Sequence, residues 1–265
     1  MKIGVFDSGV GGLTVLRALA ERIPGAEYLY LGDTARLPYG AKSRETVAKY
    51  ATSSARFLVE QGAEFLVIAC NTASALALEE IREAVPVPVL GVVETGANAA
   101  DAGSQTRDVL VIATAATVES HAYAAACAER GLRALEKACP LLVPLVEEGW
   151  IEHPVTEEVL RIYLSELMAQ ARIEALKPDT LVLGCTHYPL LRAQIERVAH
   201  ESLRVIDSAQ VTARQVERML DGSLPREEDA GTRFFATDSV AKFQALGSRF
   251  LGRAIDGVEL VDLGG

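Results

Sequence analysis

The sequence predicts an α/β protein with two similar halves, each a mainly parallel sheet flanked by helices. Short apolar, β-branched runs alternate with longer segments of helical period, a pattern typical of parallel strands joined by helical crossovers. The pattern also restarts: IGVFDSG at 3–9 has a counterpart in VLVIATA at 109–115, and FLVIACNT at 65–72 has one in TLVLGCTH at 180–187. Both pairs place Ser, Thr or Cys just after a buried strand, which favours two halves of similar design.

Ten strands are expected from the apolar runs, and helices fill the gaps between them. The strands are expected at 2–6, 27–31, 65–69, 88–92, 108–113, 141–145, 180–184, 203–206, 233–236 and 258–262. Several helices carry end signals, such as N-cap hydroxyls, first-turn prolines and glycines just past the end. These signals are Ser43 before 44–61 with Gly62 after it, Gly131 after 117–130, Thr156 with Glu157 and Glu158 opening 157–176, and Pro189 at the start of 189–201.

The two halves are expected to form two domains. The small, polar stretch GANAADAGSQTR at 96–107 follows an apolar strand and is interpreted as a crossing between them. The tail from about residue 208 holds two more helices and short strands that can pack back on the first half. We therefore predict a first domain of residues 1–97 plus 208–265 and a second domain of residues 98–207.

Composition excludes several classes of function. A net charge of -10 does not favour electrostatic binding to phosphate backbones, so nucleic acid is not expected as a partner. The start MKIGVFDSG is not a signal peptide, and no apolar stretch approaches the roughly eighteen residues of a membrane span, so a cytoplasmic protein is expected. The four cysteines are too scattered for a disulfide framework or a zinc site, so reduced thiols and no metal are expected.

Ligands of open α/β sheets bind beyond the carboxyl ends of the strands, where helix N-termini present free N–H groups. The side chains expected at this rim are polar, acidic or thiol-bearing. They are Asp7, Ser8, Asp33, Thr34, Cys70, Asn71, Thr72, Thr114, Glu147, Cys185, Thr186 and His187.

The glycine-rich turn DSGVGG at 7–12 allows more than one interpretation. A dinucleotide-binding loop needs G-x-G-x-x-G, but Thr14 occupies the third glycine position and Asp7 would crowd a pyrophosphate. Asp33 imitates the acid that binds a ribose, which keeps a nicotinamide-dependent dehydrogenase as a rival. A tight turn that needs glycine and a ligand-contact role for Asp7 and Ser8 both remain open.

Cys70 and Cys185 are the main candidates for chemistry. Cys127 and Cys139 are interpreted as small buried hydrophobes, as single cysteines usually are. Cys70 and Cys185 instead end a strand and precede an expected helix start, where free N–H groups lower the pKa of a thiol. Two opposed thiols favour racemisation or epimerisation, in which one removes a proton from a carbon and the other returns a proton to the opposite face. His187 and, across the cleft, Asp7 are candidates to assist them.

Five segments resemble the glutamate racemases of the cofactor-independent aspartate/glutamate racemase superfamily. They occur in the family's order and spacing over most of the chain: FDSGVGGLTVL, YLGDTARLPYGAKS, IACNTAS, CPLLVPLVEEG and LGCTHYPLL. The resemblance implies an active site in the cleft between two pseudo-symmetric domains and interconversion of L- and D-glutamate without a cofactor. It implies D-glutamate supply for peptidoglycan, and so for the cell wall and cell shape, and a homodimer for which no sequence feature selects an interface.

The resemblance also assigns roles to single residues. It implies that Cys70 deprotonates D-glutamate with help from Asp7, and that Cys185 deprotonates L-glutamate with help from His187. Glu147 would lie near the substrate amine, and Asp33 would support the site. The implied substrate contacts are Ser8, Pro38, Tyr39, Gly40, Asn71, Thr72, Thr114, Thr117 and Thr186. Ala113 stands where the family usually has glycine, which affects the expected contacts of Thr114.

Two further rivals follow from the sequence. A racemase of the same superfamily for aspartate or another acidic amino acid would differ in the side-chain reach of its pocket. A non-catalytic binding protein would make both cysteines dispensable, and their matched contexts argue against this interpretation.

Overall fold

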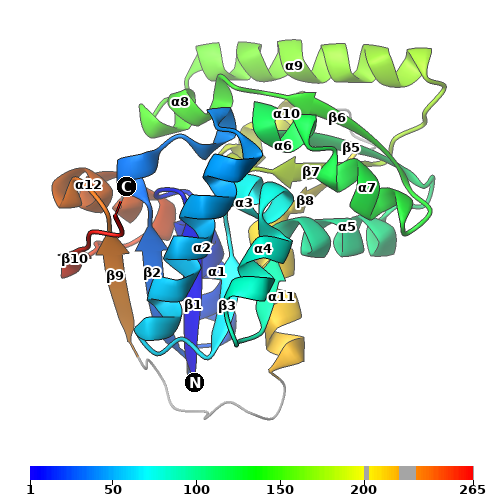
Figure 1. The fold of residues 1–265 in the computed structure, drawn as a ribbon. Coiled ribbons are helices and arrows are strands. Elements are labelled where there is room, and N and C mark those ends of the chain that lie inside the picture. The colour runs from blue at the N-terminus through cyan, green and yellow to red at the C-terminus, as the bar shows by residue number, and fades with distance from the viewer. Residues whose placement is uncertain (200–202, 221–230, 265) are drawn as a thin grey trace.

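The computed structural model describes residues 1–199, 203–220 and 231–264 of the chain. Its described strands form two sheets in which every pairing is parallel (Figure 1). One sheet has the order β10-β9-β2-β1-β3-β4 and the other has the order β6-β5-β7-β8. The predicted α/β class with two parallel sheets is confirmed.

The first sheet has helices on both faces, and its central strand β1 is almost completely buried. Tyr30 and Phe65 point to the side of α1, α11 and α12, whereas Phe6 and Leu66 point to the side of α2 and α4. The strands are β1 (Lys2–Asp7), β2 (Glu27–Gly32), β3 (Phe65–Ile68), β4 (Val89–Gly91), β9 (Thr232–Ala236) and β10 (Val258–Leu260). The helices are α1 (Leu13–Arg22), α2 (Arg44–Glu60), α3 (Asn71–Leu76), α4 (Leu78–Ala84), α11 (Ser208–Met219) and α12 (Val240–Leu251), with short 3-10 turns η1 (Thr34–Arg36) and η2 (Tyr39–Ala41).

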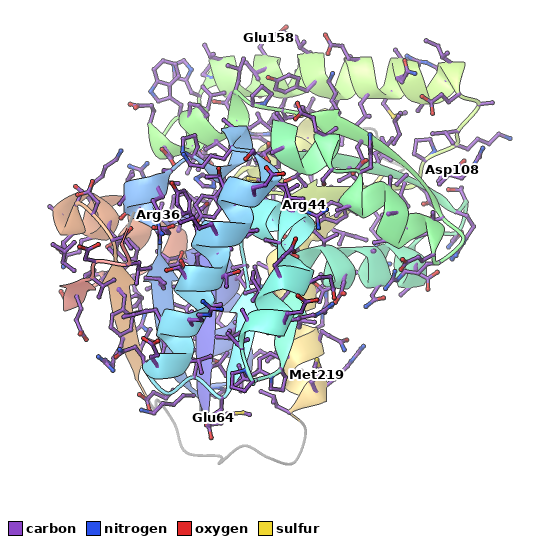
Figure 2. The ribbon with its side chains drawn as sticks, viewed as in Figure 1. Arg36, Arg44, Glu64, Asp108, Glu158 and Met219 are labelled. Carbon is purple, nitrogen blue, oxygen red and sulfur yellow. The ribbon has the colours of Figure 1, made fainter. Side chains whose placement is uncertain are left out.

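The second sheet forms the half drawn mainly in green in Figure 1, with α9 lying along its outer side. Figure 2 shows Glu158 on the side of α9 that faces away from the molecule. The strands are β5 (Asp108–Ala113), β6 (Arg133–Ala138), β7 (Thr180–Gly184) and β8 (Arg204–Asp207). The helices are α5 (Val92–Gly103), α6 (Ala115–Glu119), α7 (Ala122–Ala128), α8 (Leu142–Glu147), α9 (Pro154–Ile173) and α10 (Arg192–Val198), with the 3-10 turn η3 (Tyr188–Leu191).

The tail packs back on the first half, as predicted, because β9 pairs with β2 and β10 pairs with β9. Helices α5 and α11 pack against each other where the chain passes between the halves, and the buried hydroxyls of Thr95 and Thr212 lie 2.6 Å apart there. The domain boundaries after residues 97 and 207 fall inside α5 and just before α11, and they stay a proposal. Within the described residues, no helix combines the length and the apolarity needed to cross a bilayer.

Two predictions of secondary structure were wrong. The apolar run at 141–145 belongs to helix α8 rather than a strand, since Pro144 lies in the first turn of a helix, where its missing N–H costs nothing. The strand of this region is β6, which the sequence hides because it is a partly exposed edge strand with charged residues. The stretch 96–107, interpreted as a crossing between the halves, is occupied by α5 as far as Gly103 because it is rich in alanine.

Helix ends were predicted with mixed success. Ser43 caps α2 by accepting a hydrogen bond from the N–H of Thr46, and Gly62 and Gly131 have the positive φ values of helix-terminating glycines. The predicted helix 117–130 is interrupted at His121, which is left-handed. Helix α9 starts at Pro154 with His153 as its cap, while the hydroxyl of Thr156 donates to the carbonyl of Trp150. The predicted helix 189–201 is split into η3 and α10, and its last two residues lie outside the described residues.

Replacing Gly32 with alanine is expected to lower the free energy of unfolding by about 2 to 3 kcal/mol, because the new methyl overpacks the core. A Cβ at Gly32 would lie 2.4 Å from the backbone oxygen of Gly9 and 2.7 Å from the ring of Phe243. Gly103→Ala is the matched control, since its Cβ would lie 3.2 Å from the flexible end of Arg204. Urea unfolding checks both variants, and equal stabilities of Gly32→Ala and the parent would contradict the expectation.

Candidate active site

The two cysteines singled out by the sequence occupy equivalent places in the two sheets. Cys70 follows β3 and is the N-cap of α3, where its sulfur accepts a hydrogen bond from the N–H of Ala73 at 3.4 Å. Cys185 follows β7 directly. Each residue is only 5% exposed, so both thiols are shielded from bulk water. All four cysteines of the chain are free.

Cys70 lies beside Ser8 and Asp7 at the end of β1. Its thiol donates to the hydroxyl of Ser8 at 3.5 Å. Burial, together with the charge of Asp7, raises the pKa of Cys70 to about 12. Burial also raises the pKa of Asp7, although N–H groups of the glycine-rich turn and the charge of His187 oppose this shift. Cys70 is therefore a protonated thiol in the resting protein, next to a carboxyl group that holds a proton more tightly than usual.

Cys185 lies beside a charged pair formed by His187 and Glu147. The His187 ring places Nδ1 4.0 Å from the sulfur of Cys185 and Nε2 3.1 Å from Oε1 of Glu147. Burial alone would lower the pKa of His187, but the hydrogen bonds to Cys185 and Glu147 outweigh it and raise that pKa to about 10. The bond to His187 in turn lowers the pKa of Glu147. His187 is thus an imidazolium at neutral pH, held between Cys185 and Glu147.

Helix α12, which packs against the first sheet, braces this pair. Arg249 donates to the carbonyl oxygens of Val146 and Glu147 at 3.3 and 3.1 Å, at the end of α8. The same end is closed by Gly149, whose φ is +81° and whose N–H donates to Val146. The ring of Phe250 meets the His187 ring edge-on, with centroids 4.9 Å apart. Arg249 and Phe250 were not predicted as site residues, since no local sequence pattern links them to Glu147 and His187.

Hydroxyl groups from both halves meet at Thr72, two residues after Cys70. The Thr72 hydroxyl lies 3.1 Å from that of Thr114 and 3.3 Å from that of Thr117, and the latter two lie 2.9 Å apart. The hydroxyl of Tyr123, also missed by the sequence analysis, donates to Oδ1 of Asn71 at 2.7 Å. The amide nitrogen of Asn71 has no partner among the described residues, so it keeps two free donors.

The remaining predicted residues belong to loops that close on the same region. A Cβ at Gly40 would lie 3.2 Å from Thr114, which places the 38–40 loop against the hydroxyl cluster. Pro38 is exposed on this loop, and Tyr39 is buried. The Tyr39 hydroxyl donates to Asp33, a buried carboxylate that also binds Arg36 and Thr237. Asp33 thereby anchors the loop, which suits the supporting role predicted for it.

Thr186 joins the second half to the glycine-rich turn. Its carbonyl accepts from the hydroxyl of Thr14 at 3.0 Å, and a Cβ at Gly11 would lie 2.2 Å from its hydroxyl oxygen. Residue 11 therefore has to be glycine to allow this close approach. This gives a structural reason for one glycine of DSGVGG. The contacts described above bring the predicted residues together. Glu147 contacts His187. The proximity of Glu147 to a substrate amine stays a prediction. No group of three or more His, Cys, Asp or Glu residues in the described part of the chain could hold a metal ion.

Two buried thiols lie at equivalent strand ends of the two sheets, Cys70 beside Asp7 and Cys185 beside His187. The family model for Asp/Glu/hydantoin racemases matches residues 3–216. The chain belongs to the Asp/Glu/hydantoin racemase family. A glutamate racemase from Koribacter versatilis is 52% identical over 99% of this chain and 98% of its own length.

Solved structures of this family share the fold. A glutamate racemase from Bacillus anthracis matches with a TM-score of 0.90 at 37% identity, covering 98% of this chain and 97% of its own. A glutamate racemase from Francisella tularensis, solved in complex with D-glutamate, matches with a TM-score of 0.89 at 35% identity, covering 99% and 97%. The resemblance to glutamate racemases stated from the sequence is confirmed.

The stability of this racemase is expected to fall as the pH rises from neutrality toward 10. The pKa of His187 is about 10 in the folded chain, above the ordinary 6.5, so folding tightens the hold on this proton. The resulting stabilisation is fully present below pH 6.5 and is lost as the pH rises through the folded pKa. Glu147→Gln removes the negative charge of this side chain. Urea unfolding at several pH values should therefore show a shallower decline of the free energy of unfolding with pH for the variant than for the parent. Equal slopes in both proteins would contradict this assignment.

Proposed function

We propose that the chain is a glutamate racemase that interconverts L- and D-glutamate by two-base proton transfer. Cys185 removes the Cα proton of L-glutamate, and Cys70 removes that of D-glutamate. The observation that carries the proposal is the matched pair of buried thiols, one beside Asp7 and the other beside His187. The full-length similarity to glutamate racemases supports glutamate as the substrate.

The forward reaction uses the two thiols in opposite states. With L-glutamate bound, the thiolate of Cys185 takes the Cα proton, and the imidazolium of His187 lies beside its sulfur. The Cα electron pair is then protonated on its other face by the thiol of Cys70, which yields D-glutamate. Cys70 loses one proton and Cys185 gains one. The enzyme therefore ends with a thiolate at Cys70 and a thiol at Cys185.

The reverse reaction starts from a thiolate at Cys70. Burial disfavours this thiolate, so a nearby group has to accept its proton. Asp7 is buried beside Cys70, has a raised pKa, and has one carboxylate oxygen without a partner among the described residues. Asp7 therefore takes the proton of Cys70 when D-glutamate binds, while Cys185 takes a proton from solvent. Cys70 then gains the Cα proton, the thiol of Cys185 protonates the other face, and Asp7 releases its proton to solvent at the end of the turnover.

The substrate carboxylates are held by neutral donors. The proposed donors are the amide of Asn71 and the clustered hydroxyls of Thr72, Thr114 and Thr117. Neutral donors bind carboxylates and stabilise the developing charge at Cα, and they disturb the pKa values of the thiols less than a guanidinium would. Ser8, Thr186 and the loop 38–40 complete the proposed substrate contacts.

The wider role follows from the reaction. D-glutamate made by the enzyme is proposed to enter peptidoglycan, and thereby to support the cell wall and cell shape. A cytoplasmic location is part of the proposal because the mechanism needs both thiols reduced, a state that the cytoplasm maintains. The homodimer also stays a proposal, and light scattering of the purified chain tests it.

The function is tested by incubating the purified chain with each enantiomer of glutamate and of aspartate in deuterium oxide. Racemisation of glutamate is expected, with deuterium at Cα of the product, because the proton delivered by the second thiol comes from solvent. Aspartate should react at least about a hundredfold more slowly, since its shorter side chain leaves pocket donors unpaired. Faster turnover of aspartate would reassign the substrate, and no Cα exchange with any of the four would refute a racemase.

A further inference from the structure

Tyr123 lies at the contact between the two halves, and its hydroxyl points at Asn71. Tyr123 belongs to α7 of the second half, and Asn71 is the first residue of α3 in the first half. The Tyr123 hydroxyl donates to Oδ1 of Asn71 at 2.7 Å, and both side chains are buried. Asn71 directly follows Cys70 in the sequence. The hydrogen bond therefore ties the second half to the immediate neighbour of one of the two thiols.

The ring of Tyr123 is held tightly by the backbone around it. A Cβ at Gly96 of α5 would lie 3.0 Å from Cε1 of the ring, and a Cβ at Gly184 of β7 would lie 3.0 Å from Cε2. The ring therefore packs directly against two backbone segments. Gly184 is also the residue before Cys185. A ring packed this closely keeps its hydroxyl in one place.

The hydroxyl of Tyr123 selects one of the two orientations of the Asn71 amide. An asparagine amide has an acceptor oxygen on one side and an NH₂ donor on the other. Burial raises the pKa of Tyr123, so its hydroxyl stays protonated at neutral pH and donates. By donating to Oδ1, the hydroxyl favours the orientation in which Nδ2 points away from Tyr123.

The NH₂ group of Asn71 is left for a ligand. Asn71 is only 3% exposed, yet its Nδ2 has no hydrogen-bond partner in the part of the chain that the structure describes. A buried donor without a partner costs free energy, which an acceptor on a ligand removes. A carboxylate is such an acceptor. If the amide turned over, Oδ1 would face the carboxylate and repel it.

We propose that Tyr123 is a positioning residue of the racemase, which fixes the amide of Asn71 so that its N–H donors face a carboxylate of the substrate. The inference rests on the proposed function, in which Asn71 binds a carboxylate of glutamate. Tyr123 acts through Asn71 rather than on the substrate itself. Because the hydrogen bond joins α7 to α3, the donors are held in place only while these helices of the two halves stay in contact.

Tyr123→Phe tests the proposal, because it removes the hydroxyl and keeps the ring that packs against Gly96 and Gly184. The carboxylates of glutamate are charged both in the bound substrate and in the transition state, so a misplaced amide weakens the binding of both alike. KM for each enantiomer should therefore rise at least about tenfold, while kcat should fall less than about threefold. Calorimetry with glutarate, a dicarboxylate that lacks the amine, should show an affinity lowered by the same factor as KM is raised.

Tyr28→Phe is the matched control. Tyr28 is also buried and donates one hydrogen bond, to the carbonyl oxygen of Ile23 at 2.8 Å, but it lies near the start of β2, at the opposite end of that strand from the site. Its replacement should keep KM and the affinity for glutarate within about twofold of the parent, although both variants lose one buried hydrogen bond. Urea unfolding shows whether the two variants lose similar stability.

A double-mutant cycle with Asn71→Ala separates positioning from a general structural role. In the Asn71→Ala background, Tyr123→Phe should change KM and the affinity for glutarate less than about twofold, since no amide is left to orient. An unchanged KM in Tyr123→Phe, an equal rise in Tyr28→Phe, or a full further loss in the Asn71→Ala background would overturn the proposal. The glutarate measurement does not depend on turnover. A parent chain that failed to racemise glutamate would therefore refute the proposed function, and glutarate affinity would still decide this inference.

Discussion

Replacing either Cys70 or Cys185 with serine is expected to lower kcat for racemisation by about a thousandfold or more. A serine hydroxyl is a far weaker acid than a thiol, so it fails as the base in one direction and as the proton donor in the other. The two groups act in the same turnover, and loss of either one stops inversion. Polarimetry with each enantiomer of glutamate measures the effect.

Cys127→Ser is the matched control, because Cys127 is also fully buried but lies in α7, outside the site. It should keep racemisation within a few-fold of the parent. Each active-site variant should still exchange the Cα proton of one enantiomer without inversion, L-glutamate in Cys70→Ser and D-glutamate in Cys185→Ser. Full racemisation in either variant would refute the two-thiol mechanism.

Asp7→Asn and His187→Asn are each expected to lower kcat by about a hundredfold, because each removes the proton partner of one thiol. Since both enantiomers have equal free energy, kcat/KM must fall equally in the two directions in either variant. The primary isotope effect with Cα-deuterated substrate separates the roles. It should rise for D-glutamate in Asp7→Asn and for L-glutamate in His187→Asn, as the corresponding deprotonation becomes the slow step.

Glu147→Gln serves as the comparison, since it keeps the hydrogen bond to His187 and removes only the charge. A loss of about tenfold is expected, smaller than for His187→Asn, because the imidazole remains in place. If Asp7→Asn and His187→Asn each raised the isotope effects of the two enantiomers alike, Asp7 and His187 would not serve separate thiols.

The sheets were predictable because buried parallel strands are nearly continuous apolar runs, as in FLVI of β3 and TLVLG of β7. The errors arose where this signal fails. Strand β6 carries Arg133, Glu136 and Lys137 because it lies at a sheet edge, and α8 resembles a strand because it is short and apolar. Period alone cannot separate a short buried helix from a strand.

The candidate site was predictable to the extent that its residues follow strands of parallel sheets. Strand ends on one edge of a sheet meet in space, so Asp7 could be grouped with Cys70 and Thr114 with Cys185 from their positions alone. The pairing of Glu147 with His187 was not predictable, because it depends on the Gly149 turn that ends α8. Nor was the contact between Tyr123 and Asn71, which are 52 residues apart and belong to different halves.

By itself the sequence determined the inventory of the enzyme: two thiols in matched settings, the polar residues that follow the strands, the repeated α/β design and the family. Only the tertiary structure decided that His187 pairs with Glu147, and that Arg249 and Phe250 of α12 brace Glu147 and His187 from 102 and 63 residues away, respectively. The physical reason is that apolar patterning and end signals act over a few residues. The pKa values of Cys70 and His187 are instead set by burial and by groups distant in the sequence that folding brings together, Asp7 beside Cys70 and Glu147 beside His187.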